Sequence, residues 1–200
     1  RLIQERERCP VIFVPLATLE CHGPHVTMGM DPINDTFCAR ETCKRIGKGV
    51  VYPTIHCGTE RERPAWMLES IGFKPTDWVV GMDFPTALWK SHYSKEHIFG
   101  LILANEIKFL VDHDYKVIVI VNGHGAVNQM ETIDLLSKDF SNTTDTLLVW
   151  NLTIPEDILK DGLAGHADIY ETSMMMYYQK LFGSNSIVDF STLPVKNVPI

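Results

Sequence analysis

Two carboxylates and two imidazoles lie close together near the start of the chain, and together they could bind a metal ion. Glu20, His22, His25 and Asp31 fall within twelve positions. Histidine nitrogens mixed with carboxylate oxygens suit zinc, manganese or iron(II), whereas calcium and magnesium prefer oxygen almost alone. Packing like charges together costs free energy unless a cation compensates for it. Each residue alone is more often a solvated loop residue, but the cluster favours a divalent metal site.

The apolar run at residues 11–16 predicts the strand that positions this cluster. Such a run is typical of a buried strand, and the Gly23-Pro24 dipeptide indicates a turn after it. Open α/β sheets bind their ligands at the carboxyl ends of strands. If the extended conformation persists to His22, the side chains of Glu20 and His22 point to the same side.

A second candidate site follows the β-branched run at residues 115–121. This run is typical of a strand buried on both faces of a parallel sheet, and it ends in the sequence Asn-Gly-His-Gly at 122–125. Glycines on both sides of His124 let the backbone turn tightly and leave the imidazole unobstructed. A lone histidine is usually a loop residue, but this position makes His124 the natural candidate for a further metal ligand.

A third polar segment joins an expected strand at 146–150 to an expected helix that runs through 174–182. His166 and Glu171 lie where this helix begins, and the amino end of a helix favours a carboxylate. Glu171 on its own could equally cap the helix.

A fourth segment, Glu60-Arg61-Glu62-Arg63, follows an expected strand at 50–55. A run of charges is usually solvated, but its place at a strand exit makes contact with a substrate an equal alternative. The aromatic residues scattered over 65–89 are expected to close a core or a subunit interface.

Composition limits the class of protein. The chain has 200 residues, of which 45% are hydrophobic and 22% charged, which suits one globular domain over 1–200. The net charge of -7 and the lack of a Lys/Arg cluster argue against nucleic acid. No apolar run reaches membrane-spanning length and the first residues lack a signal-peptide core, so we expect a cytoplasmic protein. Five cysteines without a CxxC pair indicate neither a disulfide framework nor a thiolate zinc site.

Strands and helices are expected to alternate, which predicts an α/β protein with a parallel sheet. The clearest helix is expected at 94–114, with Ser94 as its cap. Because the chain begins in what is expected to be the end of a helix and stops without a closing element, it is expected to lack terminal segments. The other helices are expected at 32–46 and 128–138.

Three motifs, in this order, resemble the creatininase (creatinine amidohydrolase) family. They are Leu-Glu-Cys-His-Gly-Pro-His with Asp31 eleven residues after Glu20, then Asn-Gly-His-Gly, then His-Ala-x-x-x-Glu-Thr-Ser. The resemblance covers about residues 11–178. It implies a three-layer α/β/α sandwich with a mainly parallel central sheet, two divalent metal ions per chain (zinc, manganese or iron) and a homo-oligomer, often a hexamer.

The resemblance also assigns roles to matching residues. Creatininase has a glutamate two residues after the histidine of the Asn-Gly-His motif, where this chain has Ala126. Other members lack that glutamate and use the one in the Glu-Thr-Ser motif, which is Glu171. His166 matches a family histidine that implies a proton shuttle or an oxyanion partner, so His166 and Glu171 are the expected catalytic residues. The implied metal ligands are Glu20, His22, Asp31, which bridges the ions, His124 and Glu171.

The resulting hypothesis is a hydrolase that cleaves a C–N bond in a cyclic amide, amide or formamide of a small polar metabolite. A hydroxide shared by the two ions would attack the carbonyl. Ala126 and Gly125 make creatinine itself a doubtful substrate, and Asn128 stands one position later than in the family motif. Residues expected to contact substrate are Glu60, Arg61, Arg63 and His25.

Two alternatives stay open at this point. The same nucleophile would also open an oxidised, inositol-type cyclic diketone by breaking a C–C bond. The altered motif after His124 would also suit a family member that binds metal or ligand without catalysis.

Overall fold

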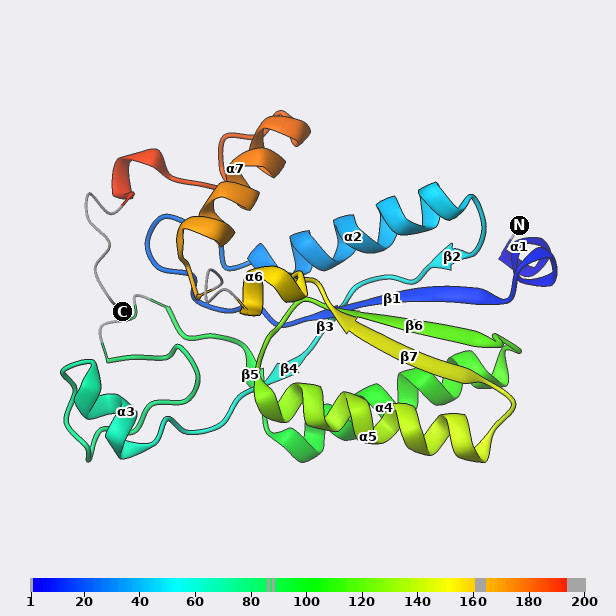
Figure 1. Ribbon diagram of the computed structural model, residues 1–200, viewed down its shortest axis with the longest axis horizontal. Coiled ribbons are helices and arrows are strands. Elements are labelled where there is room, and N and C mark those ends of the chain that lie inside the picture. Colours follow the sequence, from blue (N-terminus) through cyan, green and yellow to red (C-terminus); the bar gives the residue numbers. More distant parts are fainter. Residues whose placement is uncertain (1, 86, 88, 161–164, 194–200) are drawn as a thin grey trace. The chain divides into compact units, whose positions relative to one another are not determined.

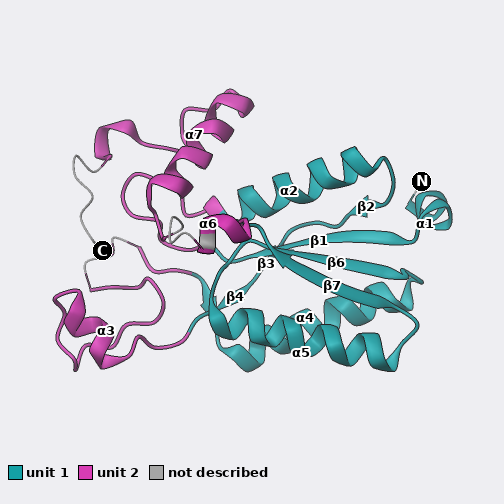
Figure 2. Cartoon of the chain, in the orientation of Figure 1, with its two compact units in different colours: residues 1–19, 31–60, 92–153 teal, residues 20–30, 61–91, 154–200 magenta. Residues whose placement is uncertain are grey.

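A computed structural model describes residues 2–85, 87, 89–160 and 165–193 (Figure 1). The chain divides into two compact units, each made of three segments (Figure 2). Among the described residues, no helix is long and apolar enough to cross a bilayer. The expectation of a single domain stays a prediction. Unit 1 comprises residues 1–19, 31–60 and 92–153, and unit 2 comprises 20–30, 61–91 and 154–200.

Unit 1 is built on a parallel sheet. Strand β1 (Val11–Ala17) pairs on one side with β6 (Val117–Asn122), which pairs in turn with β7 (Leu147–Leu152). On its other side β1 pairs with β2 (Val50–Val51) and β3 (Ile55–His56). All of these pairs are parallel, and the expected α/β class with a mainly parallel sheet is confirmed.

Helices cover both faces of this sheet. Figure 1 shows α2 (Met30–Ile46) on one face and α4 (Glu96–Asp112) with α5 (Val127–Thr143) on the other. A short helix, α1 (Leu2–Arg8), precedes β1. The expected three-layer α/β/α arrangement is therefore confirmed.

Successive side chains of β1 point to opposite faces of the sheet, which explains why helices cover both faces. Phe13 packs with Ala39 of α2, whereas the neighbouring Ile12 and Val14 belong to the core on the other face. Each strand residue thus buries an apolar side chain, which is the usual condition of a strand inside a parallel sheet. The core that contains Ile12 and Val14 also includes Leu16, Phe99, Leu103, Ile107, Leu110, Ile118, Ile120, Ile133 and Leu148.

The single strand expected at 50–55 is two short strands. Val50 is opposite Ile12 and Ile55 is opposite Leu16, so the partner numbers differ by 38 at one end and by 39 at the other. One extra residue therefore lies between β2 and β3. Pro53 stands at this interruption, and proline supplies no N–H to a sheet.

Two helix boundaries also differ from expectation. Ser94 is not a cap, because it belongs to β5 (Tyr93–Ser94), which pairs in parallel with β4 (Gly58–Thr59). The N-cap of α4 is Lys95, which makes no side-chain capping bond. Helix α5 extends to Thr143 rather than ending at 138, because Phe140 still packs on the core.

Unit 2 contains α7 (Ile169–Phe182), which begins five residues earlier than Met174. The side chain of Asp168 caps its amino end by accepting the N–H of Glu171 at 3.0 Å. Gly183 ends it with a φ of 63°, a left-handed conformation that suits glycine. The other helices of unit 2 are α3 (Ala65–Ser70), α6 (Glu156–Lys160) and the 3₁₀ turn η1 (Phe190–Thr192).

The segment 61–91 of unit 2 has its own small core. Its buried residues are Leu68, Val79 and Phe84, and Phe84 stacks on Phe73 with ring centroids 5.1 Å apart. Three tryptophans of the same segment lie on the surface, with 71%, 77% and 71% of their area exposed at Trp66, Trp78 and Trp89.

Candidate metal centre

Unit 1 brings together one carboxylate and one imidazole at the exit of its central strands. Asp31 Oδ2 lies 3.4 Å from His124 Nδ1, and both residues are 3% exposed. Asp31 stands in the first turn of α2, and His124 lies two residues after β6. A Cβ at Gly123 would lie 2.8 Å from the Asp31 carbonyl oxygen, so only glycine permits this approach.

This finding corrects the reason expected for the glycines of the Asn-Gly-His-Gly motif. Neither Gly123 nor Gly125 has a positive φ, so the turn does not require glycine conformation there. Gly123 is needed because the Asp31 backbone lies against it, and a Cβ at Gly125 would meet nothing within 4 Å.

Unit 2 holds a second group of potential metal-binding side chains. Glu20, His22 and His166 each offer one donor atom, and these atoms all lie within 4.8 Å of one another. The His22 and His166 ring centroids are 4.2 Å apart. Glu20 and His22 are buried, and the His166 side chain is 22% exposed.

Strand alternation does not explain why Glu20 and His22 meet. Strand β1 ends at Ala17, so Glu20 and His22 both lie beyond the strand. Instead, the His22 ring folds back to its own segment, with Nδ1 3.0 Å from the Glu20 carbonyl oxygen.

Backbone carbonyls orient both imidazoles of this group. A carbonyl oxygen only accepts hydrogen bonds, so His22 carries its proton on Nδ1 and His166, whose Nε2 is 2.6 Å from the Cys21 carbonyl oxygen, carries it on Nε2. In the neutral form of each ring, the opposite nitrogen bears a lone pair. His22 Nε2 lies 3.7 Å from Glu171 Oε2, and His166 Nδ1 lies 3.9 Å from Glu20 Oε2. A ligating histidine typically donates its other N–H in this way.

Glu171 makes hydrogen bonds through both its side chain and its backbone. Its Oε2 accepts the backbone N–H of Ala167, and its own N–H is capped by Asp168. The carboxylate thus stabilises the start of α7, which was one of the two roles predicted for it, and also lies beside His22. These relations fix its position next to a candidate ligand.

The donor separations fit a transition-metal ion. Two donors each about 2.1 Å from one ion lie about 3.4 Å apart at a tetrahedral angle, and wider angles extend this distance. The observed separations are 3.4 Å in unit 1 and 3.7 and 3.9 Å in unit 2. Nitrogen and carboxylate oxygen donors together suit zinc, manganese or iron. The residues present therefore fit the implied metal.

The residues expected to contact substrate have different surroundings. His25 is 5% exposed, its Nε2 lies 2.9 Å from Thr172 Oγ1, and burial lowers its pKa, so the ring is neutral. In Arg63, Nε donates to the Gly81 carbonyl oxygen at 2.8 Å. Arg61 is exposed and Glu60 is half-buried. Their role in substrate binding stays a prediction.

Several residues around these groups were not predicted. The Cys21 carbonyl orients His166, and Thr172 contacts His25. Neither a main-chain oxygen nor an isolated threonine leaves a pattern in one sequence.

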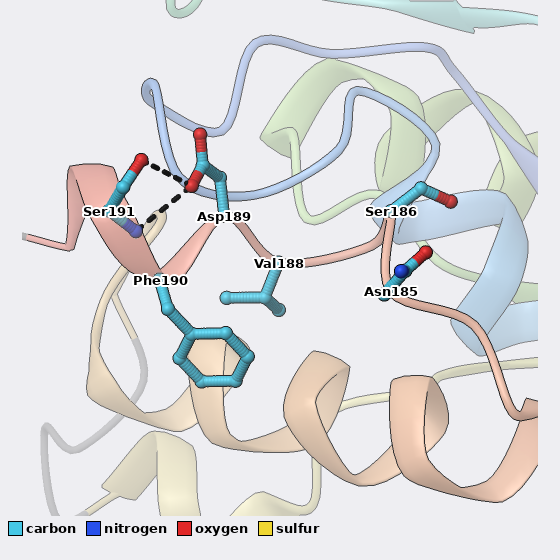
Figure 3. Close-up of a pocket in the computed structure, with 6 residues that line it drawn as sticks. All are labelled: Asn185, Ser186, Val188, Asp189, Phe190 and Ser191. Carbon is cyan, nitrogen blue, oxygen red and sulfur yellow. Dashed lines mark hydrogen bonds between the residues drawn. The ribbon is translucent and has the colours of Figure 1, made fainter.

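A separate hollow of about 430 Å³ in unit 2 is lined by residues 185, 186 and 188–191, which Figure 3 draws as sticks. Its carboxylate, Asp189, already accepts hydrogen bonds from Ser191. Its lining includes no histidine or cysteine.

Comparison with known proteins assigns the class. The profile of the creatininase family, described as creatinine amidohydrolase, matches residues 2–182. The chain therefore belongs to the creatininase family.

Among its relatives, the creatinine amidohydrolase of Pseudomonas putida is 24% identical over 196 residues, covering 90% of this chain and 68% of that protein. A creatininase structure named for manganese gives a TM-score of 0.61 at 23% identity, covering 96% of this chain and 75% of the other. A glutamate-to-glutamine creatininase variant of zinc-zinc type also gives a TM-score of 0.61 at 23% identity, covering 96% of this chain and 75% of the other.

Proposed function

We propose that this protein is a metal-dependent amidohydrolase that cleaves a C–N bond in a small polar metabolite. The observation that carries this proposal is the group formed by Glu20, His22 and His166, whose donor atoms lie within 4.8 Å in a chain of the creatininase family. The relative from Pseudomonas putida, 24% identical to this chain, bears the name creatinine amidohydrolase, which supports an amide bond as the target.

The proposed metal ligands are Asp31 and His124 in unit 1 and Glu20, His22 and Glu171 in unit 2. A structural zinc site needs four ligands, and the pair Asp31 and His124 supplies only two. We assign Asp31 as the ligand shared by two divalent ions.

Glu171 takes the place of the glutamate that creatininase has after its Asn-Gly-His motif. Ala126 stands at that position, is 5% exposed and has no donor side chain. Glu171 Oε2 lies 3.7 Å from His22 Nε2, which supports a common ion for these two residues.

Divalent ions bound by these residues would lower the pKa of a water molecule toward about 7 and polarise a carbonyl group. The chain itself supplies orientation and proton transfer. The carbonyl of Cys21 holds His166 with its basic Nδ1 toward the donor group, 3.9 Å from Glu20 Oε2. In this role His166 is a base and not a metal ligand, so its Nδ1 can take a proton from the attacking water and pass it to the leaving nitrogen. The partial exposure of His166 permits that exchange.

Substrate recognition is assigned to the segment 60–63 and to His25. Two arginines in this segment favour a polar or anionic substrate over neutral creatinine. The exposed tryptophans of 61–91 also favour a subunit interface, and we expect a homo-oligomer.

The test is a metal assay joined to a substrate panel. Protein purified with zinc or manganese should retain more than one ion per chain and hydrolyse at least one cyclic amide, amide or formamide. Replacing His124→Ala should reduce bound metal and lower kcat by at least about 100-fold, because it removes a ligand. The control is Ser137→Ala, which lies in α5 outside the candidate ligands.

Three outcomes would contradict the proposal. Activity that survives His124→Ala with unchanged metal content would refute the ligand assignment. Turnover confined to cyclic diketones would replace C–N hydrolysis by C–C hydrolysis. Stable metal binding without turnover on any substrate would indicate a binding protein.

A further inference from the structure

Gln129 connects two segments that leave the sheet of unit 1. It lies in the first turn of α5 and is 0% exposed. Its Oε1 accepts the backbone N–H of Thr59 at 3.0 Å, and its Nε2 donates to Asn122 Oδ1 at 2.8 Å. Both ends of the amide are therefore used, as burial of a polar side chain requires.

Asn122 passes this connection on to the backbone of His124. Its Nδ2 donates to the His124 carbonyl oxygen at 2.8 Å, and its Oδ1 accepts the His124 N–H at 3.3 Å. The amide of Asn122 is thus bonded to both backbone groups of the histidine. These bonds fix the peptide planes on either side of the residue, from which its imidazole projects.

The polarity of this chain of bonds has only one solution. The N–H of Thr59 can only donate, so Gln129 must present its oxygen there and its NH₂ to Asn122. Asn122 must then present its oxygen to both Gln129 and the His124 N–H. A satisfied buried network of this kind holds one conformation.

We propose that Gln129 is a positioning residue that holds His124 in its metal-binding orientation, acting through Asn122. The proposal rests on the proposed function for the statement that His124 binds metal. Gln129 acts on His124 through its hydrogen bond to Asn122, so its effect is indirect. Residues that orient a metal ligand typically change metal affinity by about 10- to 100-fold when replaced.

Two variants separate the two ends of the amide. Gln129→Glu keeps an oxygen for the Thr59 N–H but turns a second oxygen, in place of the donor, toward Asn122 Oδ1. Gln129→Met keeps the length of the side chain and removes both bonds. Ser137→Ala is the matched control, because it deletes a buried hydrogen bond of 2.7 Å to the Ile133 carbonyl oxygen in the same helix.

The first readout is zinc affinity, measured by competition with a chromophoric chelator. Both Gln129 variants should bind zinc about 10- to 100-fold more weakly than the unaltered protein, and Ser137→Ala should bind within about twofold of it. Circular dichroism and the urea midpoint show whether each variant is folded. Wild-type-like zinc affinity in a folded Gln129→Glu would overturn the proposal.

The second readout needs no metal. In the zinc-free protein, the NMR signals of the His124 backbone amide and imidazole should shift in Gln129→Glu and not in Ser137→Ala. Unchanged His124 signals would overturn the proposal even if the protein proved to bind no zinc. A different result is also decisive. If the unaltered protein binds no zinc but the His124 signals still shift in Gln129→Glu, the proposed function and the metal-binding part of this inference are wrong. If Gln129→Met does not fold, Gln129→Glu alone decides.

Discussion

Asp35 is a buried carboxyl on α2, one helical turn after the candidate ligand Asp31. It is 0% exposed, and its Oδ2 has no hydrogen-bond partner among the described residues. Its pKa is raised to about 8, mainly by burial and in smaller part by the charge of Asp31, while hydrogen bonds from Thr36 and Leu16 partly oppose the rise. Asp35 therefore holds a proton at neutral pH.

Replacing Asp35→Asn should stabilise the protein, and more so at higher pH. Between its ordinary pKa of 3.8 and its folded value of about 8, Asp35 binds a proton only in the folded state. Its contribution to stability is complete below 3.8 and falls by about 1.4 kcal/mol per pH unit as the pH rises through this window. Asparagine carries no such dependence.

The measurement is urea unfolding of both proteins in chelator at pH 5 and pH 7.5. The gain from Asp35→Asn in free energy of unfolding should be larger at pH 7.5 by at least about 1.4 kcal/mol. Equal gains at the two pH values would show that the pKa of Asp35 is not raised.

Residue types were predictable where chemistry depends on type alone. Glu20, His22, Asp31 and His124 could be proposed from spacing because histidines and carboxylates at strand exits form a recognisable set. Their orientation could not, since His22 is turned by a main-chain carbonyl. Sequence patterns carry no information on which carbonyl a ring will meet.

Strand β4 passes close to Thr18 and Gln129 in unit 1. A Cβ at Gly58 would lie 2.6 Å from Thr18 Cβ and 2.8 Å from Gln129 Oε1. Neither neighbour is free to move, because Thr18 Oγ1 donates to the His92 carbonyl oxygen at 2.7 Å and Gln129 is held at both ends. Glycine is required here by space and not by backbone conformation.

Replacing Gly58→Ala should therefore destabilise the protein by about 1–3 kcal/mol, the usual cost of overpacking. The matched control is Gly100→Ala in α4, where the new Cβ would meet only Thr132 Cγ2 at an ordinary 3.5 Å. That control should be neutral or stabilising by up to about 1 kcal/mol, because alanine favours a helix. Thermal unfolding of both variants tests this, and a Gly58→Ala protein as stable as Gly100→Ala would contradict the packing.

For strands with continuous β-branched runs, both ends were predicted to within about two residues. The runs expected at 11–16 and 115–121 are β1 and β6, because a strand buried on both faces must be apolar throughout. The strand expected at 50–55 is interrupted at Pro53. Ser94 is not the expected helix cap, because it pairs with β4 as part of β5. Pairing between distant segments decides such positions.

For the whole molecule, the fold and the family could both be predicted, because three motifs in order recorded them. The division into two units could not, because each unit is assembled from three separate segments. Candidate ligands fall in both units, and Glu20 and Asp31 stand where the chain passes between them. The proposed centre therefore depends on both units binding the same ions.

The most direct test is a crystal structure of the protein with bound manganese or zinc, using the anomalous signal at the metal edge. We expect two peaks about 3.5–4 Å apart, as in two-metal hydrolases. Donor atoms of His124 and His22 should each lie about 2.0–2.2 Å from a peak, with Asp31 bridging. Peaks that contact the residues of one unit alone, or only surface side chains, would contradict it.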